Sequence, residues 1–244
     1  MFGLLGPARL PGPGGVPVAV PGTKARTLLA ALLLAEGRAV PDDRLAELLW
    51  GGRPPGTARA QLYTYACRLR GRLDGRAALV RQARGYALLA GPHPVDVAEF
   101  ERLAADGHRA LAAGRPGAAA AALRAGLALW RGPALADVTE QLRDAEQAAL
   151  EEARTGALES RIEAELALGE HLRLVPELWA LVLAHPLRER PRAALMTALF
   201  RAERRAEAFL VYQEGCRLLD VELGAGPGPA LVTAYRSGLA GLLA

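Results

Sequence analysis

The spacing of hydrophobic residues at the start of the chain predicts short strands followed by helices. Apolar runs at residues 2–5 and 16–20, separated by prolines and glycines, are typical of two short strands. A helix follows, with Thr23 as its predicted N-cap and Gly37 as its stop. A second helix is predicted over residues 41–50, where two aspartates lie at its positive end.

The next segment predicts a loop, a third helix and a hairpin. The glycines and prolines of residues 51–56 exclude a helix there. Thr57 is the predicted cap of a helix that reaches Leu73, and β-like runs at 79–82 and 86–89 predict a hairpin. Strand, three helices and hairpin is the order of a winged helix-turn-helix. We therefore expect a domain of this type over residues 1–92.

From residue 95 the pattern is almost entirely helical, with a domain boundary predicted at 91–95. The motif Gly169-Glu170-His171 recurs in weaker form 34 residues later, which is the period of tetratricopeptide helical hairpins. The predicted fold class is thus mainly α with small β elements: a winged helix-turn-helix, then a tetratricopeptide-like α-helical repeat domain over residues 95–244. Glycines and prolines separate the helices predicted at 96–113, 117–130, 141–168, 170–184, 188–201, 204–220 and 229–243.

The third helix is the most informative element. At about 100° per residue, small and leucine side chains form one apolar stripe. The stripe consists of Ala58, Leu62, Ala66, Leu69 and Leu73. Roughly opposite lie Gln61, Thr64 and Arg68, flanked by Tyr65 and Arg70, among others. Arginine can bond guanine, glutamine can bond adenine, and threonine offers a methyl group to thymine, so this face suits the major groove. The plainer alternative is a surface helix solvated by its arginines.

Charge separates the two predicted domains. Residues 1–92 contain 13 lysines and arginines against 5 acidic residues, whereas the remainder carries a net charge of −4. A basic first part joined to a mildly acidic remainder indicates a polyanionic partner for the first part only. Lys24 and Arg26, at the start of the first helix, are candidates for binding phosphate. Arg84 in the hairpin is a candidate for a minor-groove or phosphate contact, the alternative being an exposed turn charge.

Other classes of function have little support in the sequence. The two serines lie in no nucleophile-elbow context, there is no Walker loop, and the histidines lack ligand spacing, so we expect neither an enzyme nor a metal or other cofactor. No apolar run is long enough to span a membrane and no secretion signal opens the chain, which predicts a cytoplasmic protein. The main alternative is a tetratricopeptide-type scaffold with a vestigial winged helix, against which the basic first part argues.

Several motifs occur together along the chain. They include Leu4-Leu5-Gly6-Pro7, Lys24-Ala25-Arg26-Thr27, Leu48-Leu49-Trp50-Gly51, Arg84-Gly85-Tyr86, Leu129-Trp130-Arg131-Gly132-Pro133 and His185-Pro186-Leu187-Arg188-Glu189. In this combination the chain resembles the Streptomyces antibiotic regulatory protein family. That family joins an OmpR-like winged helix to a bacterial transcriptional activator domain built of tetratricopeptide-like helices.

The resemblance implies a pathway-specific activator of a secondary-metabolite (antibiotic) gene cluster. Such proteins bind promoter direct repeats in double-stranded DNA, often as homodimers, and contact RNA polymerase through the loop between the second and third helices. By position in the motif, Thr64 and Arg68 correspond to base readers, and Gln61, Tyr65 and Arg70 correspond to contacts with the DNA backbone. Because Gln61 lies on the same exposed face as Thr64 and Arg68, it is also a candidate for reading a base. The corresponding polymerase loop, for which a rigid turn is the alternative, is Trp50, Gly51, Gly52, Arg53, Pro54 and Pro55.

The chain departs from the family pattern at two positions of the third helix. Cys67 and Gly71 stand where related winged helices often carry basic residues, so the chain lacks candidates for phosphate contacts at these positions. Gly71 also weakens the helix by about 1 kcal/mol relative to alanine.

Overall fold

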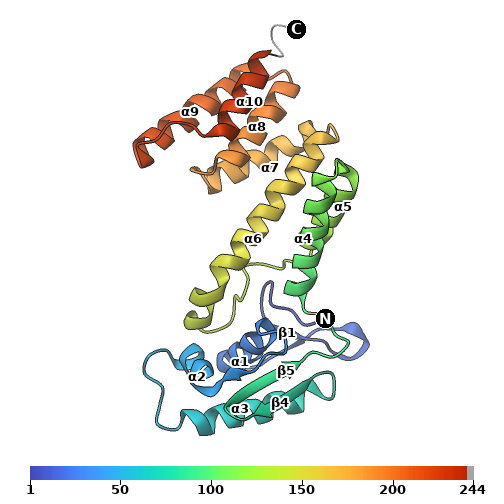
Figure 1. Cartoon of the computed structure of the whole chain (residues 1–244), viewed down its shortest axis with the longest axis vertical. Coiled ribbons are helices and arrows are strands. Elements are labelled where there is room, and N and C mark those ends of the chain that lie inside the picture. The colour runs from blue at the N-terminus through green and yellow to red at the C-terminus, as the bar shows by residue number, and fades with distance from the viewer. Residues whose placement is uncertain (241–244) are drawn as a thin grey trace. The chain divides into compact units, whose positions relative to one another are not determined.

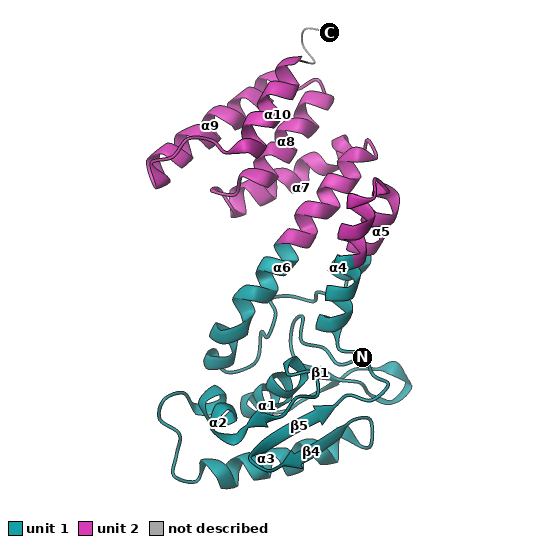
Figure 2. Cartoon of the chain, in the orientation of Figure 1, with its two compact units in different colours: residues 1–105, 124–155 teal, residues 106–123, 156–244 magenta. Residues whose placement is uncertain are grey.

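The computed structural model describes residues 1–240. Its contacts divide the chain into two compact units, shown in Figure 2. The first unit combines residues 1–105 with 124–155, and the second combines residues 106–123 with 156–244.

The first unit contains the predicted winged helix, with its elements in the expected order (Figure 1). Buried leucines from its three helices form the core, because each helix directs one apolar stripe inward. The elements are β1 (Arg9–Leu10), a short 3₁₀ turn (Pro13–Gly15), β2 (Val18–Ala19), α1 (Thr23–Leu34), β3 (Val40–Pro41), α2 (Asp42–Trp50), α3 (Ala58–Leu73), β4 (Ala78–Gln82) and β5 (Gly85–Leu89).

The hairpin is part of a three-stranded antiparallel sheet in the order β3-β5-β4. In β5, Tyr86 pairs with Val40 of β3 on one side and with Arg81 of β4 on the other. Gly85 permits this close pairing, since a Cβ there would lie 2.3 Å from the carbonyl oxygen of Val40. The sequence did not reveal β3, because two residues ending in a proline show no alternation.

Two local predictions at the start of the chain were wrong. Within residues 2–5, Phe2 and Gly3 form isolated bridges to Val95 and Arg9, and the amides of Leu4 and Leu5 bond to a side chain, so no strand forms there. The second strand is only Val18–Ala19. Gly22, with a φ of 84°, occupies the N-cap position of α1. Thr23 therefore lies inside the helix, where its hydroxyl accepts a hydrogen bond from Arg26.

One buried carboxylate joins the N-terminal segment to the start of α4 (Asp96–Ala112). Asp96 is 1% exposed and accepts hydrogen bonds from the amides of Leu4 (2.7 Å) and Leu5 (3.0 Å). It also pairs with the guanidinium of Arg131 at 2.9 Å. This carboxylate therefore satisfies two backbone donors that no strand partner reaches.

Two threonines connect α1 and α2 to the start of α6 (Glu140–Ala167), a helix whose residues 140–155 belong to the first unit. The amide of Thr139 donates to the Thr27 hydroxyl at 2.9 Å, and the Thr139 hydroxyl donates to the carbonyl of Leu48 at 2.6 Å. The packing unit thus extends beyond the predicted boundary at residues 91–95. The division into sequence domains 1–92 and 95–244 remains a prediction. The compact units of the structure are divided at other residues, 105/106, 123/124 and 155/156.

The second unit is helical throughout its described part. Its core lies among α7 (His171–Ala184), α8 (Glu189–Arg201), α9 (Arg205–Leu223) and α10 (Pro229–Ala240), with the end of α6 and part of α5 (Pro116–Leu127) in the same unit. Gly169 and Glu203, 34 residues apart, both have positive φ values (84° and 60°) just before a helix. The predicted repeat therefore corresponds to two equivalent helix–helix turns. The last residues of the predicted helix 229–243 lie outside the described residues.

Candidate DNA-binding surface

Helix α3 is held by an apolar stripe that leaves its other face exposed. Leu62, Ala66, Leu69 and Leu73 are each at most 2% exposed, as the helical period predicts. The helix packs against α1, α2 and β4. It contains four arginines and no acidic residue, so every charged side chain of the helix is positive.

The predicted reading residues lie together on that exposed face. Thr64 and Arg68 are exposed, and Gln61 and Tyr65 are half-buried beside them around a shallow depression of about 300 Å³. The Gln61 amide donates to the Thr57 hydroxyl at 2.9 Å, and Thr57 makes no side-chain hydrogen bond as a cap. Within residues 1–240, the Arg68 guanidinium has no hydrogen-bonding or charged partner. It is thus available to an external acceptor.

Arg70 is not brought to this face. Its Nε donates to the carbonyl of Leu79 at 2.9 Å, and its guanidinium lies over the ring of Tyr86, 5.9 Å from the centroid. The side chain is half-buried and attaches α3 to the hairpin. A phosphate contact by Arg70, as the family pattern suggests, remains a prediction that must compete with these contacts.

Lys24 also serves an internal contact. Its Nζ donates to the carbonyl of Leu49 at 2.6 Å and lies 4.8 Å from the centre of the Trp50 ring. Burial lowers the pKa of Lys24. The Trp50 ring is in turn 6.3 Å from that of Tyr65. The predicted Lys24–phosphate contact stays untested, but the geometry gives this lysine a second role in positioning Tyr65 through Trp50.

Arg26 points toward the interior of its unit. Its Nε donates to the carbonyl of Asp137 at 2.7 Å and pairs with the carboxylate of that residue at 3.2 Å. The guanidinium also donates to the carbonyl of Val20. Three partners inside the unit leave it little capacity for phosphate.

The two arginines of the hairpin differ in their surroundings. Arg81 makes a two-pronged pair with Asp42, at 2.5 and 2.6 Å, and this hydrogen bonding raises the pKa of Arg81. Arg84 is exposed at the turn and has no side-chain partner within the described chain. Of the two, Arg84 is therefore the one free to reach DNA.

The loop between α2 and α3 presents an exposed tip on a fixed base. Gly51 has a φ of 72°, which favours glycine, and Trp50 before it is held by Lys24. Gly52, Arg53 and Pro54 are exposed, and no partner for Arg53 occurs in residues 1–240. The base of the loop thus serves the fold, and its tip is available to a partner.

Sequence reasoning missed the contacts that position this surface. The carboxylate of Asp96 and the hydroxyls of Thr27 and Thr139 carry no distinguishing pattern, since an acidic residue at a helix start is read as a dipole or capping group. The one available signal was their type: polar residues within otherwise apolar surroundings. In the described part of the chain, no helix has the length and apolar character needed to cross a bilayer.

Comparison with known proteins places the chain among transcriptional regulators. Residues 95–237 match the model of the bacterial transcriptional activator domain. Regulatory protein AfsR of Streptomyces griseus is 43% identical over 206 residues, which cover 84% of this chain and 21% of AfsR. Regulatory protein DnrI of Streptomyces peucetius is 39% identical over 219 residues, covering 85% of this chain and 80% of DnrI. The chain therefore spans about a fifth of AfsR but most of DnrI.

A solved structure extends the likeness to the fold. The structure of Mycobacterium tuberculosis EmbR in complex with a low affinity phosphopeptide superposes with a TM-score of 0.88 at 35% sequence identity. The superposition covers 98% of this chain and 64% of the EmbR chain. The agreement includes both the winged helix and the helical repeats, which confirms the predicted fold class. The chain belongs to the bacterial transcriptional activator domain family, among the Streptomyces antibiotic regulatory proteins.

Proposed function

We propose that this chain is a sequence-specific activator of transcription that inserts α3 into the major groove of promoter DNA. The observation that carries the proposal is the acid-free, exposed face of α3, on which Arg68 has no partner within the described chain. Thr64 and Arg68 are the proposed base readers, with Gln61 able to reach either a base or the backbone. Arg84 at the hairpin turn supplies a further phosphate or minor-groove contact.

The proposal extends to the partners that family membership suggests. The chain binds direct repeats as a homodimer, contacts RNA polymerase through the loop at residues 50–55, and activates a secondary-metabolite gene cluster. It works in the cytoplasm on the nucleoid and catalyses no reaction. Support for these points comes from the regulators DnrI and AfsR and from the exposed loop tip around Arg53.

Binding to duplex DNA is expected to weaken steeply with salt. Each phosphate neutralised by a cation releases counterions, so five contacts give a slope of log K against log salt of about −4 to −5. Affinity then falls by about 500-fold between 50 and 200 mM salt. Fluorescence anisotropy with a labelled promoter fragment measures this slope. A flat response favours the alternative of a protein-binding scaffold whose winged helix does not bind DNA.

Replacing Arg68 with alanine is expected to weaken operator binding by about 1–3 kcal/mol and to relax specificity at one base pair. The side chain has no internal partner, so its loss should leave the fold intact. Binding is measured on the operator and on a set of single-base variants.

The matched control is Arg72→Ala, which removes an exposed arginine from the same helix beside the reading face. This control should weaken binding to every sequence by a similar factor. If Arg68→Ala behaves in the same uniform way, Arg68 is a phosphate contact and not a base reader.

A further inference from the structure

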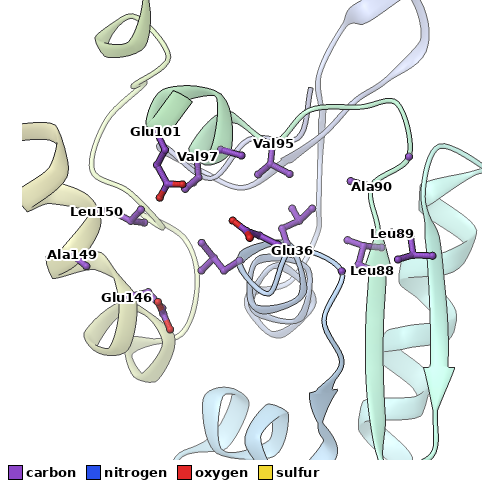
Figure 3. A pocket seen from close by; sticks show the side chains of 15 residues that line it. Glu36, Leu88, Leu89, Ala90, Val95, Val97, Glu101, Glu146, Ala149 and Leu150 are labelled. Atoms are coloured by element: carbon purple, nitrogen blue, oxygen red, sulfur yellow. The ribbon is translucent and has the colours of Figure 1, made fainter. Parts of the chain in front are cut away.

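The first unit contains a second surface feature that DNA binding does not use. A cavity of about 680 Å³ opens between the end of α1, strand β5 and the helices α4 and α6 (Figure 3). All of its lining residues belong to the first unit. Its volume lies within the range of about 300–1,000 Å³ that is typical of small-molecule sites.

The walls of this cavity are aliphatic. Leu33, Leu88, Val97 and Leu150 present buried side chains from four different elements, and Leu89 remains 49% exposed at the edge. No aromatic ring lines the cavity. A ligand would therefore gain from burying an aliphatic group here and would find nothing to stack on.

Three carboxylates accompany these walls. Glu36 follows α1, Glu101 lies on α4 and Glu146 lies on α6. In Figure 3 the side chains of Glu36 and Glu101 are directed into the space between the walls. None of the three has a hydrogen bond or ion pair to its side chain within residues 1–240, and no lysine, arginine or histidine lines the cavity.

The negative charges of these carboxylates are not balanced by any cationic side chain in the lining of the cavity. Glu36 and Glu101 are exposed at the mouth of the cavity, and partial desolvation together with the neighbouring charge of Glu36 raises the pKa of Glu101. A cation between the carboxylates would remove this repulsion. A primary ammonium group has three N–H donors, so one such group can serve two neighbouring carboxylates at once.

We propose that the cavity is a binding site for a small aliphatic amine, with its ammonium group between Glu36 and Glu101 and its tail against the leucine and valine walls. The proposal stands apart from the proposed function, because the cavity shares no residue with the reading face of α3. An occupant would contact both β5 of the hairpin sheet and the helices α4 and α6.

Calorimetric titration of the full chain with three ligands of equal tail length tests the proposal. The probes are n-octylammonium, n-octanol and n-octanoate, which differ in the charge of the head group. Octylammonium should bind about tenfold or more tighter than octanoate, with octanol between them. Equal binding of all three probes, or no binding of octylammonium, overturns the proposal.

Two pairs of variants locate the binding. The double variant Glu36→Gln/Glu101→Gln should weaken octylammonium binding by about fivefold or more, whereas Glu140→Gln/Asp144→Asn, which removes the same charge from exposed positions of the first unit, should not. Ala149→Phe places a ring against the cavity and should abolish binding, whereas Ala148→Phe, at an equally exposed position that does not line the cavity, should not. If a variant and its matched control weaken octylammonium binding equally, the ligand does not bind in this cavity.

Discussion

Replacing Asp96 with alanine is expected to lower the free energy of unfolding by about 3–5 kcal/mol. The carboxylate accepts the amides of Leu4 and Leu5 and pairs with Arg131, and it is 1% exposed. Its removal leaves two buried N–H donors unsatisfied, at about 1–3 kcal/mol each. It also leaves the guanidinium of Arg131 without its charged partner.

Urea unfolding followed by tryptophan fluorescence measures this loss. Trp50 and Trp130 report on the first unit and Trp179 on the second, so single-tryptophan versions separate the two transitions. The matched control is Asp144→Ala, an exposed carboxylate on α6, which should change stability by no more than about 0.5 kcal/mol. A loss below about 1 kcal/mol for Asp96→Ala means that other groups or water satisfy the two amides.

Asp96 also bears on where the DNA-binding part of the chain ends. A fragment ending at residue 92, the boundary that composition and pattern suggest, lacks both Asp96 and Thr139. The amides of Leu4 and Leu5 and the carbonyl of Leu48 then lose their partners. The winged helix is therefore a sequence domain whose packing depends on residues that follow it.

The reading face of α3 could be predicted because its information is local. The helical period alone places Leu62 and Leu69 in the core and Thr64 and Arg68 on the exposed side. Helix order and the hairpin followed from glycine, proline and the spacing of apolar residues in the same way. Such features depend on neighbours within about four residues.

The roles of the surrounding cations could not be predicted, because they depend on partners far along the chain. Arg26 contacts Asp137, 111 residues away, and Arg81 contacts Asp42, 39 residues away. Lys24 bonds to a backbone carbonyl, which no side-chain pattern marks. A positive residue near a helix start therefore has the same sequence signature whether it binds phosphate or an internal oxygen.

The difference between residues with internal partners and residues that are exposed also guides the design of a loop variant. Trp50 belongs to the fold, since its ring lies beside Lys24 and Tyr65, whereas Arg53 and Pro54 are exposed. Removing the whole of residues 50–56 would disturb Tyr65 on the reading helix. A deletion confined to Arg53 and Pro54 shortens the tip and leaves the base in place.

Deleting Arg53 and Pro54 is expected to reduce transcription in vitro to the level of RNA polymerase alone, because the proposed polymerase contact is lost. Operator affinity should change by less than about twofold, as for other surface changes. Promoter transcription and operator binding are measured on the same preparation. Trp50→Ala is the contrasting variant: it removes the ring between Lys24 and Tyr65, so both activities should fall. If the deletion also abolishes operator binding, the loop serves only the fold and the polymerase contact lies elsewhere.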